Sequence, residues 1–241
     1  MARMAPAPFP DPDRPVVLDR REGPYGEVVL RRHGALLQII ANGCFLMDTS
    51  DGRSERLLVS AALGELPGPP AGPAAPAVLI GGLGVGFSLA EAAAEPRWGR
   101  ITVVERERAI VDWHRAGPLA GLTAGALDDP RTELVHADLV SHLAAPGPRY
   151  DALCLDIDNG PDWTVTPDND GLYSPAGLAA CRDRLAPGGV LAIWSARPSD
   201  DFRRHLLDAG FGNVHTREVP VARGVPDVLF LASHHLARQS A

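Results

Sequence analysis

The stretch from Ala77 to Glu105 constrains the fold of this chain more than any other. It begins Ala-Val-Leu-Ile-Gly-Gly-Leu-Gly-Val-Gly-Phe-Ser and ends Ile-Thr-Val-Val-Glu. The stretch thus contains, in this order, an apolar strand, a glycine-rich turn, a helix and a second apolar strand with an acidic end. This order predicts a βαβ unit that binds a nucleoside, because glycines let the backbone turn sharply and let a ligand approach the amides at the helix start.

The glycines of this turn and the carboxylate at the strand end are the first candidate ligand-binding residues. The glycines are Gly81, Gly82, Gly84 and Gly86. Glu105 follows them by about 20 residues, where a carboxylate can accept hydrogen bonds from two ribose hydroxyls. A structural turn is the alternative, since a lone glycine pattern is weak evidence for a nucleotide site. A P-loop is excluded, because no Lys-Ser or Lys-Thr follows the glycines and the chain contains no lysine.

Strands and helices alternate after residue 76. We expect strands at 77–81, 101–105, 133–136, 151–156, 189–195, 213–219 and 227–232. We expect helices near 86–95, 107–116, 138–144, 174–186 and 199–209. The alternation predicts a Rossmann-like α/β domain over 77–241, with a mostly parallel seven-stranded sheet, helices on both faces and an antiparallel pair formed by the last two strands. Ligands of such sheets bind beyond the carboxyl ends of the strands.

A smaller unit precedes this domain. Residues 16–66 contain short β-type runs separated by His-Gly, Asn-Gly and Asp-Gly turns, which predict a small antiparallel β-domain. A helix is expected over 54–65 at its end. Residues 1–15 are expected to form a flexible arm, and the segment 66–76, rich in proline, glycine and alanine, is the expected linker.

Composition limits the classes of partner. The net charge is −7, and the 23 basic residues, all arginine, form no basic stripe, so nucleic acid is not an expected partner. The three cysteines and eight histidines show neither a disulfide framework nor the spacing of metal ligands. No apolar run reaches the roughly 20 residues that cross a bilayer, and the first residues lack the apolar centre of a secretion signal. A cytoplasmic protein without a metal or a membrane partner is therefore expected.

Asp138 follows the third strand of the predicted α/β domain. It can cap the next helix, because aspartate is a favourable N-cap residue, and it can also accept a hydrogen bond from an adenine amino group. Both roles are compatible. Arg106 and Leu139, each next to one of the candidate carboxylates, are further candidate nucleoside contacts.

Two carboxylates separated by one residue end the fourth strand. Asp156 and Asp158 belong to the sequence Leu-Asp-Ile-Asp-Asn-Gly-Pro-Asp-Trp. Carboxylates at this edge could bind an amine, remove its proton or stabilise a sulfonium, whereas the alternative is a structural turn. The polar segment 162–173 that follows is long enough for a lid or a plain surface loop. Its Tyr173 is a third candidate catalytic residue, and Asp156 is also a candidate cofactor contact.

A set of short motifs accompanies these residues from about Val17 onwards. They are the glycine loop, Thr102-Val-Val-Glu, Asp129-Pro-Arg, Ala137-Asp, Tyr150-Asp-Ala-Leu-Cys-Leu-Asp, Leu172-Tyr-Ser and Leu185-Ala-Pro-Gly-Gly-Val-Leu. Together with the small β-domain they resemble the spermidine synthase family, aminopropyltransferases built on the class I adenosylmethionine methyltransferase fold. The resemblance implies that Glu105 holds the ribose, Asp138 the adenine, and that Asp156 lies beside the attacking amine. It also implies dimers or larger homo-oligomers joined through the β-domain.

The chain departs from the family at the glycine loop. The family sequence is Gly-Gly-Gly-Asp-Gly-Gly, in which the aspartate grips the aminopropyl ammonium, whereas this chain has Gly84 at that position. A carboxylate there would repel the carboxylate of intact adenosylmethionine, so Gly84 favours the unmodified cofactor over its decarboxylated form. Three further family motifs, including Tyr-Gln and Tyr-His-Glu, are altered and weaken the prediction of putrescine binding. They fall at Tyr25-Gly26, near Ser54-Glu55-Arg56 and at Asp156-Ile-Asp-Asn-Gly-Pro.

The sequence therefore predicts an adenosylmethionine-dependent transferase that moves an alkyl group, with methyl favoured, from the sulfonium to an amine or another nucleophile. Aminopropyl transfer from decarboxylated adenosylmethionine to a diamine is an alternative, with Asp158, Asp162 or Asp168 replacing the missing anchor. A cyclase or lyase that releases methylthioadenosine and a non-catalytic nucleoside-binding module are also compatible with these residues. The sequence does not identify the acceptor.

Overall fold

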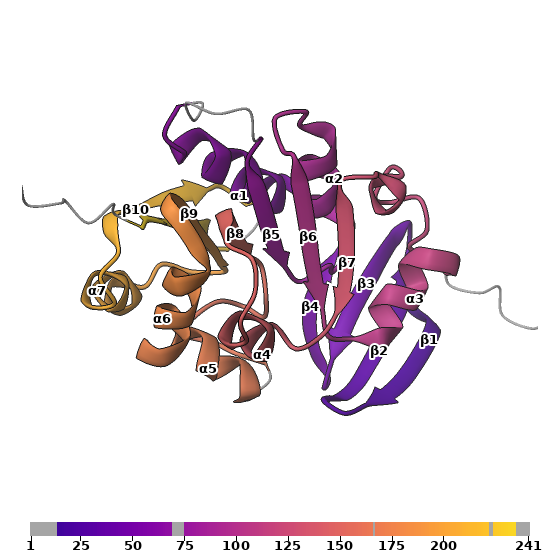
Figure 1. Cartoon of the computed structure of the whole chain (residues 1–241). Coiled ribbons are helices and arrows are strands. Elements are labelled where there is room, and N and C mark those ends of the chain that lie inside the picture. Colours follow the sequence, from indigo (N-terminus) through magenta and orange to yellow (C-terminus); the bar gives the residue numbers. More distant parts are fainter. Residues whose placement is uncertain (1–13, 69–74, 166, 222–223, 235–241) are drawn as a thin grey trace, which may run out of the picture.

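Two β-sheets of different size organise the computed structural model of this chain (Figure 1). The structure describes residues 14–68, 75–165, 167–221 and 224–234, so most of the expected arm and linker, at 1–13 and 69–74, lies outside the described residues. The smaller sheet is antiparallel, with its strands in chain order. They are β1 (Val16–Gly23), β2 (Gly26–His33), β3 (Leu36–Ala41) and β4 (Cys44–Asp48).

The larger sheet has seven strands in the order β10-β11-β9-β8-β5-β6-β7. Neighbouring strands from β9 to β7 pair in parallel, whereas β11 is antiparallel to both β9 and β10. This confirms the mostly parallel seven-stranded sheet and the antiparallel final pair. The bounds are β5 (Ala77–Gly81), β6 (Arg100–Glu105), β7 (Thr132–His136), β8 (Tyr150–Leu155), β9 (Leu185–Ser195), β10 (Gly212–Val219) and β11 (Asp227–Ser233).

Helices cover both faces of the larger sheet (Figure 1). One face is covered by α1 (Arg53–Glu65), α2 (Phe87–Ala94) and α3 (Arg108–Ala116). The other is covered by α4 (Leu139–Ala144), α5 (Asp170–Tyr173), α6 (Pro175–Arg184) and α7 (Asp200–Asp208). Two short 3-10 turns, η1 (Ala126–Asp128) and η2 (Pro167–Asn169), complete the described elements. Each face has its own buried apolar cluster.

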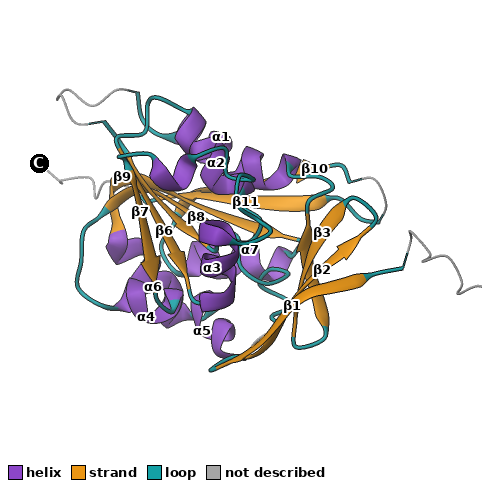
Figure 2. Cartoon of the chain, turned by 90° about the vertical axis from the view of Figure 1, so that its right-hand side faces the viewer, coloured by secondary structure: helices purple, strands orange, loops and turns teal. Residues whose placement is uncertain are grey.

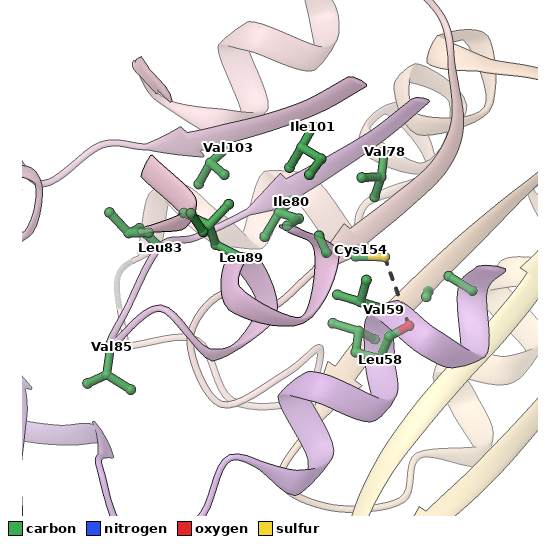
Figure 3. Packing of buried hydrophobic residues seen from close by; sticks show 14 of the residues in the cluster. Leu58, Val59, Val78, Ile80, Leu83, Val85, Leu89, Ile101, Val103 and Cys154 are labelled. Atoms are coloured by element: carbon green, nitrogen blue, oxygen red, sulfur yellow. Dashed lines mark hydrogen bonds between the residues drawn. The ribbon is translucent and has the colours of Figure 1, made fainter. Parts of the chain in front are cut away.

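Helix α1 packs against the larger sheet although it follows directly after the smaller one. Figure 3 shows its Leu58 and Val59 next to Cys154 of β8, in the same apolar cluster as Leu89 of α2 and the apolar side chains of β5 and β6. The Sγ of Cys154, on β8, lies 3.9 Å from the backbone oxygen of Leu58. The packing therefore changes from one sheet to the other before α1, whereas the sequence placed the domain boundary in the linker that follows this helix.

The smaller sheet docks beside α3 (Figure 2). The indole Nε1 of Trp113 donates a hydrogen bond to Asp19 of β1 at 2.7 Å, and Arg21 forms an ion pair with Asp112 at 2.8 Å. These contacts place β3 and β4 beyond the carboxyl ends of β5, β6 and β8, where both sheets line one cavity. The fold therefore builds its main cavity from two sheets.

The C-terminal end of α2, the helix after the glycine loop, is held by an arginine. The guanidinium of Arg131 donates hydrogen bonds to three backbone oxygens and forms an ion pair with Asp129 at 2.7 Å. The oxygens belong to Ala93, Glu95 and Trp98. A cation at this place satisfies carbonyl groups that lack partners within the helix.

We expect Arg131→Met to lower the free energy of unfolding by about 2–3 kcal/mol, because hydrogen bonds to a charged group each contribute about 1.5–3 kcal/mol and buried carbonyls lose their donor. Urea denaturation measures this loss. Arg97→Met is the matched control, since Arg97 pairs with Glu95 near the same helix end but its side chain is 65% exposed. The control should lose little or no stability, because exposed ion pairs contribute little, and equal losses in the two variants would contradict the assignment.

Candidate functional site

A cavity of about 750 Å³ lies at the carboxyl ends of the parallel strands. Gly82, Glu105 and Asp156, which follow or end β5, β6 and β8, line it from the larger sheet. Met47 of β4 and Glu55 of α1 line it from the other side. Residues that are distant in sequence meet here because the carboxyl ends of neighbouring parallel strands share one edge of the sheet.

The glycine loop contributes bare backbone to this cavity. Gly82 has a φ of +91°, and a Cβ at this position would overlap with the backbone oxygen of Asp156, so a side chain cannot be accommodated. Gly82 and Gly84 line the cavity. Gly81 instead ends β5, and Gly86 is the N-cap of α2, so these two act in the turn itself and are not among the described lining residues.

A buried histidine supports the loop from beneath. The Nε2 of His114 lies 2.9 Å from the backbone oxygen of Gly84, and because a carbonyl can only accept, the ring nitrogen donates. The side chain is 4% exposed, and burial lowers its pKa, which favours the neutral ring. Nothing in the sequence pattern distinguished this histidine, whose role arises from the packing of α3.

Gly84 and Met47 are complementary in shape. The backbone N–H of Val85 points to the Sδ of Met47 at 3.3 Å, and a Cβ at Gly84 would overlap with that sulfur. The space that a side chain at position 84 would need is therefore filled by a thioether from the smaller sheet. The sequence showed the missing side chain of Gly84 but not the residue that replaces it.

Glu105 joins the glycine loop to the end of β6. One carboxylate oxygen accepts from the N–H of Leu83 at 2.9 Å and the other from the N–H of Glu107 at 2.8 Å. The side chain is 6% exposed, and burial raises its pKa against the opposing effect of these N–H groups. A carboxylate has about four acceptor sites, so further hydrogen bonds from the cavity remain possible. The ribose contact stays a prediction that this geometry permits.

Arg106 lies between the main cavity and a smaller one of about 490 Å³, and lines both. Its guanidinium stacks over the ring of Tyr25 at 4.5 Å and donates to the Oδ1 of Asn169 at 3.0 Å. The smaller cavity is lined on another side by Asp138. Arg106 is thus placed where it can contact a ligand in either cavity.

The two remaining candidate nucleoside contacts have different surroundings. Leu139 is 6% exposed and lines the main cavity. Asp138 lines the smaller cavity, and its Oδ1 accepts from the N–H of Ser141 at 2.8 Å as the N-cap of α4. The capping role considered from the sequence is therefore present, and the adenine contact stays a prediction.

Three carboxylates from different elements come together on the other side of the cavity. Asp156 follows β8, Glu55 belongs to α1 and Asp227 begins β11. Burial, together with the charges of Glu55 and Asp227, raises the pKa of Asp156 well above its usual range. The pKa values of Glu55 and Asp227 are also raised, chiefly by burial. We refer to these three residues as the acidic cluster.

Ser54 lies between two members of the acidic cluster. Its Oγ is 3.0 Å from a carboxylate oxygen of Glu55 and 2.7 Å from one of Asp227. A hydroxyl has one proton and can donate to only one of them. The second contact is favourable only if a carboxyl group is protonated or a cation lies nearby. The cluster is therefore suited to a cationic ligand.

Asp158 and Tyr173 occupy different places. Asp158 lines the cavity, has a φ of +53°, and its Oδ2 accepts from the Nδ2 of Asn169 at 2.6 Å. Tyr173 is 7% exposed within the apolar cluster of α4–α7, and its hydroxyl donates to the backbone oxygen of Ile157 at 3.3 Å. The structure thus places Tyr173 beneath the Asp156–Asp158 turn and not among the described lining residues, which favours a supporting role over the catalytic one expected from the sequence.

Sequence reasoning missed several lining residues and one supporting residue. They are Met47, Glu55, Asn169, Asp227 and His114. Only Glu55 lay in a segment that the sequence analysis had singled out, near the position of the family's Tyr-His-Glu motif. The other four residues reach the site through tertiary contacts. Among the described residues, no group of three or more His, Cys, Asp and Glu side chains is arranged to hold a metal ion, and no helix has the length and apolarity to cross a membrane.

Comparison with known proteins shows what the chain is similar to. No protein-family model matches the chain. It is 31% identical over 186 residues to polyamine aminopropyltransferases of Mycobacterium tuberculosis, which covers 76% of this chain and 33% of theirs. It is also 31% identical over 162 residues to polyamine aminopropyltransferase 2 of Pseudomonas aeruginosa, covering 60% of this chain and 42% of that protein. These similarities support the assignment of the chain as a divergent member of the spermidine synthase family.

Two spermidine synthase structures share the fold of this chain. One contains the transition state analogue AdoDATO and aligns with a TM-score of 0.75 at 18% identity over 90% of this chain and 73% of that one. The enzyme of Thermotoga maritima aligns with a TM-score of 0.72 at 18% identity over 90% and 72%. These alignments confirm the Rossmann-like α/β fold with a separate small sheet.

The relatives also bear on the expected reaction. They are named aminopropyltransferases, so they support the aminopropyl alternative better than the methyl transfer that Gly84 favoured from the sequence. The chain spans only about a third of the length of the Mycobacterium relatives.

The acidic cluster predicts how stability depends on pH. Because its pKa values are raised on folding, the folded chain binds more protons than the unfolded chain above the usual carboxyl range. This contribution to stability is complete below the unfolded pKa values of about 4 and is lost as pH rises through the raised values. Asp227→Asn removes one of these carboxyl groups and keeps an oxygen for Ser54. We therefore expect its melting temperature to fall less than that of the wild type as pH rises from about 5 to about 8.

Calorimetric melting of the ligand-free protein measures this difference. Asp183→Asn on the exposed side of α6 is the control and should follow the wild type. Identical pH slopes for Asp227→Asn and the wild type would show that the three carboxylates do not interact.

Proposed function

We propose that this chain transfers an aminopropyl group from decarboxylated adenosylmethionine to a small amine and releases methylthioadenosine. One observation carries the proposal: a single cavity has a glycine loop and Glu105 on one side and the acidic cluster on the other. The first half suits a nucleoside, and the second suits an ammonium group. The names of the relatives support the same reaction.

The donor fits the first half of the cavity. The backbone at Gly82 allows a ligand to approach closely, and Glu105 has acceptor sites left for ribose hydroxyls. Leu139 and Arg106 supply an apolar surface and a planar cation for the adenine. This arrangement brings the sulfonium towards Asp156, the first residue after β8.

The acceptor enters as an ammonium ion and is held by the acidic cluster. Asp156 takes one proton from it, and a raised pKa makes this carboxylate a stronger base than an exposed aspartate. The freed nitrogen lone pair attacks the propyl carbon bonded to sulfur. The new C–N bond forms as the C–S bond breaks, and the C–S electron pair stays on sulfur, which becomes a neutral thioether. The product leaves as a secondary ammonium ion, and Asp156 then releases the proton it accepted to solvent, so positioning and charge compensation supply most of the catalysis.

The ammonium at the end of the donor's propyl chain also needs a negative partner, because Gly84 provides none. Asp158 lines the cavity, whereas Asp162 and Asp168, the other replacements considered from the sequence, are not among its described lining residues. Glu55 lines it as well and is 8% exposed. We infer that Asp158 and Glu55 together replace the carboxylate that the family carries in its glycine loop.

The expected homodimer and the cytoplasmic location stay predictions. Val16, Val17 and Leu18 on the edge strand β1 are exposed apolar side chains that a second copy could cover. This is the sheet through which the family resemblance implies contact.

The purified chain tests the reaction directly. Incubation with decarboxylated adenosylmethionine and putrescine, cadaverine or spermidine should give methylthioadenosine and the aminopropylated amine by mass spectrometry. We expect Asp156→Asn to lower kcat by about 100-fold with a small change in donor KM, because loss of a general base costs about 10²–10⁴-fold.

Each competing reaction has its own result. A methylated amine formed from intact adenosylmethionine would replace the proposal by methyl transfer. Methylthioadenosine formed from the intact cofactor without an amine would indicate a cyclase or lyase. Nucleoside binding measured by calorimetry without any product would indicate a binding module.

Position 84 provides a test of donor choice. In Gly84→Asp with Met47→Ala, the loop regains a carboxylate and the overlapping sulfur is removed. Aspartate tolerates the φ of +49° at this position better than most residues. The ratio of the two dissociation constants should shift about tenfold towards the decarboxylated donor, which is about 1.4 kcal/mol, because the carboxylate attracts its ammonium and repels the carboxylate of the intact cofactor.

Calorimetric titration of both donors gives the ratio, and Met47→Ala alone is the matched control. The control should leave the ratio close to that of the wild type. An unchanged ratio in the double variant would show that position 84 does not control donor choice in this chain.

A further inference from the structure

We propose that Asn169 is a positioning residue that holds Asp158 and Arg106 in place on the two sides of the glycine loop. The inference rests on the proposed function, because Asp158 belongs to the amine side of the cavity and Arg106 to the nucleoside side. Both follow strands that flank β5 in the larger sheet, β8 for Asp158 and β6 for Arg106. Asn169, at the end of η2, contacts both of them.

The side-chain amide of Asn169 is used at both ends. Its Nδ2 donates to the Oδ2 of Asp158 at 2.6 Å, and its Oδ1 accepts from the guanidinium of Arg106 at 3.0 Å. A carboxylate only accepts and a guanidinium only donates, so the charges of the two partners determine which way the amide points. Asn169 is 5% exposed, and both hydrogen bonds are to charged groups, which makes them stronger than neutral ones.

Each partner needs such a contact. The φ of +53° at Asp158 is a conformation that side chains other than glycine seldom adopt, so its turn depends on neighbouring contacts. Arg106 lies over the ring of Tyr25 at 4.5 Å, in the turn between β1 and β2. Through Asn169, the amine side, the nucleoside side and the smaller sheet become parts of one hydrogen-bonded and stacked arrangement.

This arrangement makes the two halves of the cavity dependent on one side chain. Leucine at position 169 would remove both contacts. Aspartate would keep an acceptor for Arg106 but set a second carboxylate against Asp158. The two substitutions therefore separate the Arg106 contact from the Asp158 contact, which a role in packing alone would not do.

The experiment compares Asn169→Asp and Asn169→Leu in the full chain. With decarboxylated adenosylmethionine and putrescine, Asn169→Asp should lose about tenfold in kcat at neutral pH while its affinity for methylthioadenosine stays within about twofold of the wild type. Its kcat relative to the wild type should recover as pH falls, because two adjacent carboxyl groups can share one proton and restore the hydrogen bond. Asn169→Leu should lose both kcat and about fivefold or more in methylthioadenosine affinity, without recovery at low pH.

Asn213→Asp is the matched control. It makes the same chemical change at an exposed asparagine of β10, outside the cavity. Its kcat and its methylthioadenosine affinity should equal those of the wild type, because its contact with Glu65 lies outside the cavity.

Two results would overturn the assignment. One is a pH profile of Asn169→Asp that parallels the wild type, and the other is an unchanged methylthioadenosine affinity in Asn169→Leu with an unchanged melting temperature. Failure of the proposed function is distinguishable, because a wild type that forms no product would still bind methylthioadenosine. Calorimetry with this nucleoside then tests the Arg106 contact. A methylthioadenosine affinity that falls in Asn169→Leu but not in Asn169→Asp supports the positioning role.

Discussion

A buried carboxylate that accepts two backbone N–H groups is the interaction on which the rest of this site depends. Glu105 joins the glycine loop at Leu83 to the end of β6 at Glu107, and it remains 6% exposed. A buried charge is costly unless hydrogen bonds compensate it, so the loop must keep the conformation that provides those donors. That conformation in turn sets Gly82 and Gly84 at the cavity, while His114 supports the loop from beneath.

The other half of the cavity concentrates negative charge. Asp156, Glu55 and Asp227 line the same side of the cavity, and burial is the main cause that raises their pKa values. At Asp156 the charges of Glu55 and Asp227 raise the pKa further. Such a cluster destabilises the ligand-free protein at neutral pH and is stabilised by a bound cation. The same charges that cost stability thus favour an amine acceptor, which links the stability of the fold to its proposed chemistry.

Much of the fold could be predicted because periodic patterns are local. The strands at 77–81 and 101–105, the helices near 86–95 and 199–209 and the parallel sheet follow from apolar repeats and glycine turns that any short window reveals. The sequence pattern does not show which sheet α1 packs on, since its apolar residues fit either sheet. Only the packing of α1 against β8, β9 and β11 decides this. For the same reason Tyr173, polar at its tip and apolar in its ring, was expected at the cavity but lies beneath the turn.

The amino-acid pattern alone was enough to show the family resemblance, the edge of the sheet that carries the site and the residues placed there by their own strands, among them Gly82, Glu105 and Asp156. These residues directly follow or end parallel strands, and the geometry of such a sheet brings them together. Three further contacts depend on how distant segments pack together: Met47 fills the space beside Gly84, Glu55 and Asp227 join Asp156, and Asn169 bridges Asp158 and Arg106. Those contacts join segments whose separation along the chain has no regular period, so no local pattern contains them.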